Sequence, residues 1–271
     1  MDLVTTTYAE RPDLVDAAED LIGGGWPAFM SADPVEVACW PLLALHAPEL
    51  QVMVVDRGRD VPVAVGNSVP FDWDADDCSL PDDGWDGALA AGVRVAAAGT
   101  STDAACALAI TVDPSARGLG LSRIALRALR GAAAVQGCRD LVGPLRPTGK
   151  AAHPHMPMAA YVAWEDAPGR SHDPWLRVHR SIGATVAGVC PRSMTIPGSI
   201  VDWEAWTGLR FTVSGAHVVP HALVPVDIDV DAGTGRYVEP NVWVRHRLGA
   251  EERAWVPHRG ARAGGGVAVP V

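Results

Sequence analysis

The sequence predicts an α/β protein with a mixed central sheet flanked by helices. Apolar, strand-like segments alternate with amphipathic helical patterns along most of the 271 residues. One of these strand-like segments, residues 105–112, ends in Asp-Pro and passes through a glycine turn directly into a helix pattern. At 28.4 kDa the chain is also long enough to bury a full core.

The first elements follow one another closely. A strand over 3–8 precedes a helical pattern that three consecutive glycines stop at residue 23. A second helix is expected over 34–46, with Asp33 as the candidate N-cap and Pro34 in its first turn. The next segments are a predicted hairpin, an acidic turn-rich stretch and a short helix; they span 51–69, 71–85 and 86–97.

The glycine turn after strand 105–112 is the strongest functional signal. At this turn the backbone N–H groups of a helix N-terminus stay unpaired, and together with the helix dipole they favour an anion. A P-loop is excluded because Lys150, the only lysine, lies far outside the turn, and a dinucleotide fingerprint would need glycine in place of Arg123. We interpret the turn as a pyrophosphate cradle; a tight turn without a ligand is the alternative.

The order strand, Val-x-Pro, Arg-Gly-x-Gly-x-Ser, helix resembles motif A of the GNAT superfamily, the acyl-coenzyme A-dependent acyltransferases. The resemblance implies that the loop amides hold the coenzyme A pyrophosphate and that the end of the strand orients the thioester. The implied cofactor-binding residues are Ile110, Val112, Arg117, Gly118, Leu119, Gly120, Leu121 and Ser122. Ser115 stands where the family usually has Gln or Arg, and Arg117 is a candidate to supply that charge.

The predicted helix over 173–184 resembles the fourth helix of the GNAT core, which commonly ends in Tyr, three residues, Gly-Phe. Counting back from Gly183, His179 occupies the Tyr position and Ala184 replaces the Phe. Because that Tyr acts as general acid in many members, the resemblance implies that His179 is the catalytic residue and protonates the departing thiol. A surface histidine, or one paired with a carboxylate, is the alternative.

Two further groups of charged residues have a functional and a structural interpretation. Arg123, Arg127 and Arg130 form one face of the predicted helix 121–135, where they are solvated or reach the 3′-phosphate of the nucleotide. The segment 144–175 is expected to be a long functional loop. Near its end, three carboxylates either attract a cationic amine or are simply solvated: Glu165, Asp166 and Asp173.

The C-terminal part is expected to complete the same sheet. A strand over 184–190 and a short helix over 202–208 precede a two-strand ribbon of 217–230 with 236–246. The sequence therefore predicts a single domain, residues 1–258, with a core over 1–190 and an extension over 191–258. The remaining residues, 259–271, are expected to be a flexible tail.

Composition excludes several classes of function. The net charge of −10 argues against nucleic-acid binding as the main task. Without a signal-peptide pattern or a long uncharged apolar run, we expect a cytoplasmic protein that does not bind membranes. The five cysteines are scattered without a CxxC pair, and His153-x-His155 lacks a nearby carboxylate or Cys, so no metal is expected.

We expect an acyltransferase that moves an acetyl or other acyl group from a coenzyme A thioester to an amine. The acceptor is expected to be a small metabolite or an intermediate of natural-product biosynthesis. Two alternatives stay open. One is the same fold with a thioester donor bound to an acyl carrier protein. The other is a degenerate, non-catalytic domain that binds a ligand.

Overall fold

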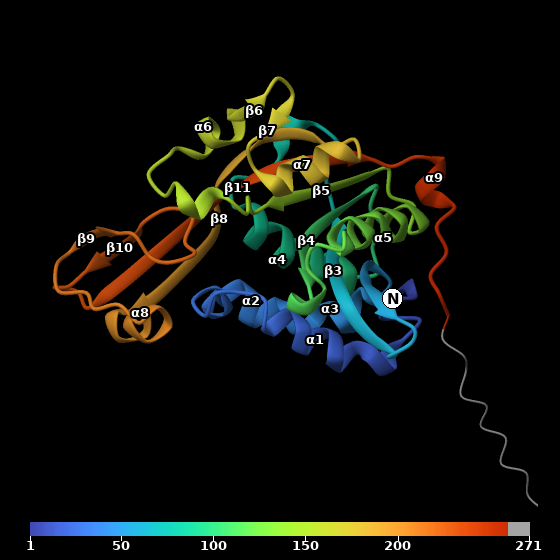
Figure 1. Ribbon diagram of the computed structural model, residues 1–271, viewed down its shortest axis with the longest axis horizontal. Coiled ribbons are helices and arrows are strands. Elements are labelled where there is room, and N and C mark those ends of the chain that lie inside the picture. The colour runs from blue at the N-terminus through green and yellow to red at the C-terminus, as the bar shows by residue number, and fades with distance from the viewer. Residues whose placement is uncertain (260–271) are drawn as a thin grey trace, which may run out of the picture.

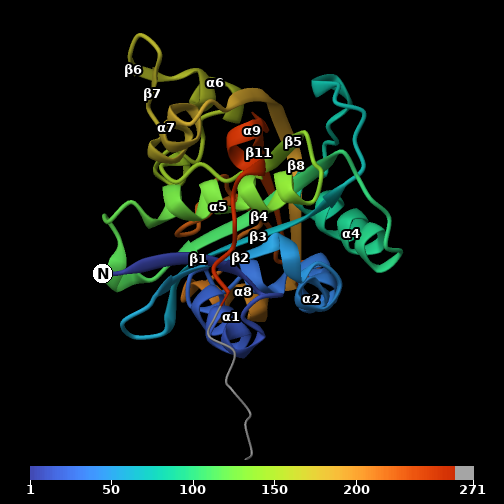
Figure 2. The same ribbon diagram turned by 90° about the vertical axis from the view of Figure 1, so that its right-hand side faces the viewer.

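The computed structural model describes residues 1–259, so the predicted tail lies, except for Arg259, outside the described residues. One large sheet runs through the molecule, with strand order β1-β2-β3-β4-β5-β11-β10-β9 and β8 paired to β11. Helices cover both of its faces (Figures 1 and 2). Among the described residues no helix is long and apolar enough to cross a membrane. The predicted mixed α/β fold is confirmed.

The first four strands form an antiparallel meander, as their apolar segments predict. They are β1 (Leu3–Thr7), β2 (Gln51–Asp56), β3 (Val61–Phe71) and β4 (Ala104–Val112). On one face lie α1 (Val15–Gly23) and α4 (Gly84–Ala97), and on the other lies α5 (Leu121–Val135). The apolar side chains of these helices bury the two faces of the sheet in separate clusters.

The helix predicted over 34–46 is interrupted, which corrects that expectation. The structure has α2 (Pro34–Cys39), a 3-10 turn over Trp40–Leu42, and α3 (Leu43–His46). Pro41 explains the break, because proline has no N–H to donate and its ring clashes with the preceding turn. The predicted N-cap is confirmed: the Asp33 side chain accepts from the N–H groups of Val35 and Glu36, at 2.8 and 3.2 Å.

The sheet opens between β4 and β5. The strand β5 (Asp140–Leu145) runs parallel to β4 and pairs with it only from Ala104 to Cys106. Its other edge is paired along its full length with β11 (Thr234–Arg247). Each strand therefore keeps one partner while the two diverge beyond Cys106, and the divergence leaves room for a cavity within the sheet.

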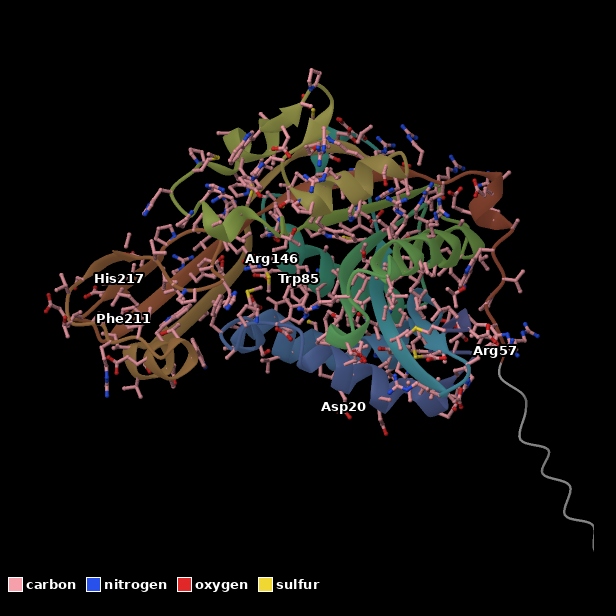
Figure 3. The ribbon with its side chains drawn as sticks, viewed as in Figure 1. Asp20, Arg57, Trp85, Arg146, Phe211 and His217 are labelled. Atoms are coloured by element: carbon pink, nitrogen blue, oxygen red, sulfur yellow. The ribbon has the colours of Figure 1, made fainter. Side chains whose placement is uncertain are left out.

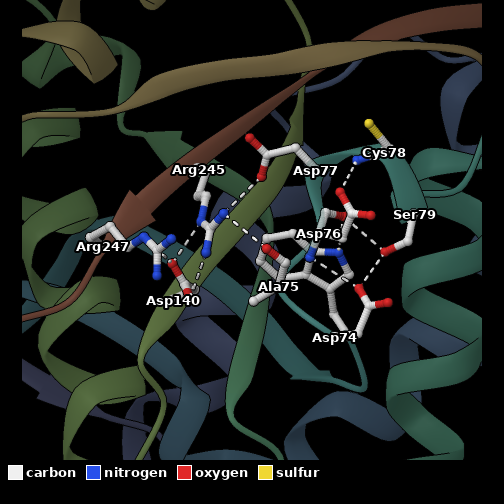
Figure 4. Close-up of polar contacts among 10 residues, drawn as sticks. Asp74, Ala75, Asp76, Asp77, Cys78, Ser79, Asp140, Arg245 and Arg247 are labelled. Carbon is white, nitrogen blue, oxygen red and sulfur yellow. Dashed lines mark hydrogen bonds and ion pairs between the residues drawn. The ribbon is translucent and has the colours of Figure 1, made fainter.

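An ion-pair cluster secures β11 beside β5 (Figure 4). The Arg245 side chain is almost buried and donates to both carboxylate oxygens of Asp140, at 2.8 and 3.2 Å. It also donates to Asp77, at 2.8 Å, and to the carbonyl of Ala75. The acidic stretch 71–85 is thereby attached to the C-terminal strand. Buried, multiply bonded pairs of this kind are costly to break.

The C-terminal ribbon has a different partner from the one predicted. The long partner of β11 is β8 (Thr185–Ser199), which continues nine residues past the expected end at 190. Between them come α8 (Ile200–Thr207), β9 (Gly215–His217) and β10 (Val226–Asp229), and β10 pairs with β11 over three residues only. These elements form an arm that projects from the main body (Figure 1).

The segment 144–175 is more structured than the long loop that was expected. It contains α6 (Met158–Ala163) and a hairpin of β6 (Glu165–Ala167) with β7 (Arg170–Ser171), and leads into α7 (Pro174–Ser181). A last short helix, α9 (Ala250–Arg253), lies against α5. Short 3-10 turns connect the elements at Pro12–Leu14, Met30–Ala32, Pro48–Leu50, Asp77–Ser79, Pro114–Ala116 and Lys150–Ala152.

Candidate active site

The glycine turn has the conformation that a cradle needs. Gly118 and Gly120 have φ of +83° and +76°, the left-handed region that other residues rarely adopt. Apart from the adjacent residues, no atom of residues 1–259 lies within 4 Å of a Cβ built on either glycine. Upstream, Asp113 Oδ1 accepts from the backbone N–H and the hydroxyl of Ser115, at 2.8 and 2.7 Å. Ser115 thus fixes the entry to the turn, and it is not available to replace the usual Gln or Arg.

The amides of the turn are free. Within the described residues, no hydrogen bond is donated by the backbone N–H groups of residues 118–122, and Gly120 caps α5 without any side chain. Leu121 is buried, so its side chain holds α5 in the core, whereas Leu119 is 60% exposed. Arg117 is exposed beside the turn. Free amides at the start of a 15-residue helix form an anion site.

A cavity of about 330 Å³ lies where β4 and β5 diverge. At the end near the glycine turn it is lined by Ile110 and Ser122, two of the predicted residues, and by His179. Val112 does not line it; that side chain packs beneath α5. The other lining residues come from both diverging strands, from α1, α2, α4, α5, α7, β8 and β11, and from the segments that connect them. They include Trp26, Met30, Glu36, Trp40, Trp85, Leu108, Pro144, Arg146, Trp175, Met194, Glu239 and Asn241.

A bulge interrupts β4 at the cavity. Ser68 pairs with Ala107 and Asn67 with Ala109, so Leu108 is the extra residue. The carbonyl of Leu108 accepts from Trp85 Nε1 at 2.9 Å instead of joining the ladder. The bulge puts the middle of the predicted strand, together with its end at Ile110, next to the cavity.

His179 is held by a well-capped helix. The Asp173 side chain is 1% exposed; Oδ1 accepts from the first amides of α7, and Oδ2 accepts from the Tyr161 hydroxyl at 3.0 Å and the Gly149 amide at 2.8 Å. Asp173 is therefore a structural cap and not a free carboxylate for an amine. Asp166 is paired with His172 and Arg177, and Glu165 with Arg180, so none of these three predicted carboxylates lines the cavity.

His179 is 6% exposed, which excludes a histidine on the helix surface. Its partner is not a carboxylate but His246 on β11: His179 Nδ1 lies 2.9 Å from His246 Nε2. Burial, followed by the charge of His246, lowers the pKa of His179 well below its ordinary value. Burial, followed by Arg130, lowers the pKa of His246 to about 4. Both imidazoles are therefore neutral at neutral pH.

Two of the three predicted arginines of α5 are hydrogen-bonded to other parts of the protein, and the third is exposed to solvent. Arg130 pairs with Glu252 on α9 and donates to the carbonyl of Ile182, while Arg123 donates to Ser181 at 3.0 Å. Arg127 is exposed. Arg130 is thus a structural residue, and the predicted basic face is smaller than the sequence suggests.

The end of the cavity away from the glycine turn combines aromatic walls with charged side chains. No pattern in the sequence pointed to this part of the site. Trp40 and Trp85 stack at 6.0 Å, with 13° between their planes, and the side-chain carboxylate of Glu36 has no hydrogen-bond partner among residues 1–259. Burial, followed by the charge of Asp33, raises the pKa of Glu36 to about 7. Figure 3 labels Arg146 and Trp85, both of which line this cavity. Arg146 Nε donates to both oxygens of the fully buried Glu239, at 3.0 Å each.

His153 is part of a cluster of rings, in contact with Tyr161, Trp164 and His172. No three side chains of the described residues are arranged to hold a metal ion.

Known proteins that are similar to this chain include a curated relative and two solved structures of comparable size. The chain is 36% identical to an arginine N-acetyltransferase of Aspergillus versicolor, over 89% of this chain and 93% of the relative. The loading GNATL domain of CurA from Lyngbya majuscula has a TM-score of 0.55 at 17% identity, with 91% of this chain and 96% of that chain covered. The GphF GNAT-like decarboxylase, in complex with isobutyryl-CoA, has a TM-score of 0.54 at 18% identity, with 92% and 100% covered. No family model matches the sequence.

Proposed function

This chain belongs to the GNAT superfamily and transfers an acyl group to an amine, and we propose that its donor is an acyl-CoA and its acceptor arginine or a small molecule with the same end groups. The cavity carries the proposal, because it extends from Ser122, the last residue of the turn with a free amide, to Glu36 and Arg146.

The donor end fits a pyrophosphate. Gly118 and Gly120 have left-handed φ angles, and the open space around both glycines admits a phosphate to the main chain, whose amides are free there. We expect the free amides of residues 118–122 to hold the pyrophosphate, with the Arg117 side chain beside them. The similar decarboxylase was solved with isobutyryl-CoA, which is consistent with this donor class.

The acceptor end fits a molecule with a cation and a carboxylate. A guanidinium can stack on the Trp40–Trp85 pair while Glu36 accepts its hydrogen bonds. Arg146 uses Nε for Glu239 and Nη2 for the carbonyl of His221, so Nη1 is left for a carboxylate of the acceptor. The similarity to an arginine N-acetyltransferase supports the same acceptor class.

The reaction needs the two ends brought together. The amine nitrogen bonds to the thioester carbonyl carbon, the C–S bond breaks, and its electron pair leaves on sulfur. Holding both substrates in one cavity supplies much of the rate, because it removes the entropic cost of their encounter. His179 remains the candidate catalytic residue, since it lines the cavity at the donor end.

The two alternative functions are not favoured. A non-catalytic domain does not agree with a 36% identical acetyltransferase. A carrier-protein donor would use the basic face of α5, but two of its arginines are bonded to the protein itself. A small amine acceptor and a cytoplasmic location stay proposals.

The test is an assay of acyl transfer. Purified protein with acetyl-CoA should release free thiol in proportion to added arginine, and mass spectrometry should show N-acetylarginine. Arginine-dependent release should be lost in Gly120→Glu and kept in Gly169→Glu, whose glycine has a matching φ of +74° and open space but lies in the β6–β7 turn. Absence of amine-dependent release with arginine and with other basic amines would contradict the proposal.

A further inference from the structure

The outer nitrogens of the histidine pair have no partner. The bond between His179 Nδ1 and His246 Nε2 holds a single proton, because one nitrogen must donate and the other accept. Within residues 1–259, the two remaining nitrogens, His179 Nε2 and His246 Nδ1, are buried without a hydrogen-bond partner. Buried polar atoms are nearly always paired, so these two require an explanation. Since His179 lines the cavity, a substrate atom is a suitable partner for its Nε2.

A third buried atom near the histidine pair is also unpaired. Arg130 uses Nη1 for the carbonyl of Ile182 and Nη2 for Glu252, but its buried Nε has no acceptor among the described residues. Arg130 lies close enough to His246 for its charge to lower the pKa of that imidazole. A guanidinium N–H can only donate, so beside it a lone pair on His246 Nδ1 is favoured over a second N–H.

We propose that Arg130 and His246 together hold His179 in the tautomer that carries its proton on Nε2. With a lone pair on His246 Nδ1, the proton of His246 is on Nε2 and donates to His179 Nδ1. The proton of His179 is then on Nε2, at the cavity. Glu252 has the opposite influence on His246, but its carboxylate is engaged by Arg130 and by the amide of Gly249.

This inference rests on the proposed function, and it changes the role of His179 from a general acid to a neutral hydrogen-bond donor. An imidazole that stays neutral cannot give up its last N–H proton, but it can stabilise charge that develops in the transition state. As the C–S bond breaks, the electron pair leaves on sulfur and Nε2–H donates to that sulfur. The surplus proton of the amine goes to water, and water protonates the free thiolate. His246 and Arg130 are positioning residues.

Two variants of His246 distinguish a role in positioning His179 by hydrogen bonding from a role in packing alone. His246→Gln can keep an N–H donor to His179 Nδ1 and an oxygen toward Arg130, whereas His246→Leu keeps similar volume without either. We expect His246→Leu to lose about 10- to 100-fold in kcat at nearly unchanged KM for acetyl-CoA, and His246→Gln to recover most of it. Equal losses in both variants, or no loss in either, would overturn the proposal.

A spectroscopic measurement shows which nitrogen of His179 carries the proton, and it needs no catalytic turnover. In nitrogen NMR of histidine-labelled wild-type protein, the signal of His179 is assigned by its loss in His179→Gln. We expect an Nε2-protonated neutral imidazole from pH 6 to pH 8. An Nδ1-protonated ring, or titration in that range, would overturn the inference. Because this result does not depend on the acceptor, it also distinguishes failure of the inference from failure of the proposed function.

Discussion

At the scale of single residues, Glu36 gives the acceptor end its expected selectivity. Its pKa is raised to about 7, so the proton must leave before the carboxylate can bind a cation. We therefore expect KM for arginine to fall as the pH rises from 6 to 8. In Glu36→Gln, KM for arginine should be at least about 10-fold higher and should lack the Glu36-dependent change over this pH range.

This expectation is checked by steady-state kinetics with arginine and with citrulline, an analogue of arginine whose side chain is uncharged. KM for citrulline should be the same in wild type and in Glu36→Gln, because the side chain of citrulline carries no positive charge for Glu36 to bind. Unchanged KM for arginine in Glu36→Gln would show that another group binds the cation.

The residues of the cradle could be predicted from the sequence, whereas the partners of His179 could not. Gly118, Gly120 and Ser122 follow from a local order of strand, turn and helix. The bond to His246 joins residues 67 positions apart, and nothing near His246 in the sequence indicates it. Glu36 was placed in a predicted helix, but which face of that helix lines a cavity depends on packing. The binding and catalytic roles of these residues stay predictions.

At the scale of elements, the N-terminus of α7 positions His179. We expect Asp173→Ala to lower the free energy of unfolding by about 2 kcal/mol or more, because two helix amides, a buried hydroxyl and the Gly149 amide lose their acceptor. Acyl transfer should fall as well, since the helix that carries His179 is loosened.

The matched control is Ser199→Ala, which removes the N-cap of α8 on the projecting arm. It should cost about 1 kcal/mol and leave kcat unchanged. Denaturant unfolding and initial rates measure both effects. A stable and fully active Asp173→Ala protein would mean that α7 does not position the histidine through its cap.

Elements whose limits are set locally could be predicted, and elements that depend on distant pairing could not. The strand 51–56 and the helix 121–135 match their apolar patterns, and Pro41 could have indicated the break in the helix 34–46. The partner of β11 is a different case. The segments 217–230 and 184–199 both have strand-like patterns. Only the assembled sheet shows that the second of them pairs with β11 over most of its length.

At the scale of the whole molecule, a buried carboxyl pair joins three parts of the chain. Asp33 precedes α2, and Asp86 lies on α4 and accepts from the Thr195 amide of β8 at 3.0 Å. Burial, followed by the charge of Asp33, raises the pKa of Asp86 to about 8. Asp33 Oδ2 and Asp86 Oδ1 are both buried and have no hydrogen-bond partner among residues 1–259.

This pair should make stability depend on pH. The unfolded Asp86 loses its proton near its ordinary pKa, but the folded one keeps it to about pH 8, so the free energy of unfolding falls as the pH rises between these values. Asp86→Asn is neutral over this whole pH range and does not titrate. Its Tm relative to wild type should therefore increase from pH 5 to pH 8.

Thermal unfolding at several pH values measures this difference, with the exposed Asp82→Asn as control. A constant difference in Tm between Asp86→Asn and wild type would contradict the raised pKa of Asp86. The pair links the helical layer to the arm, and β11 links the arm to β5. These links support the prediction that residues 1–258 form one domain, which stays a prediction.

The central claim is that the glycine turn binds an acyl-CoA, and calorimetric titration with acetyl-CoA tests it most directly. We predict a dissociation constant of about micromolar order for wild type and Gly169→Glu, and no measurable binding for Gly120→Glu. No binding by the wild-type protein, or equal binding by Gly120→Glu, would contradict the account.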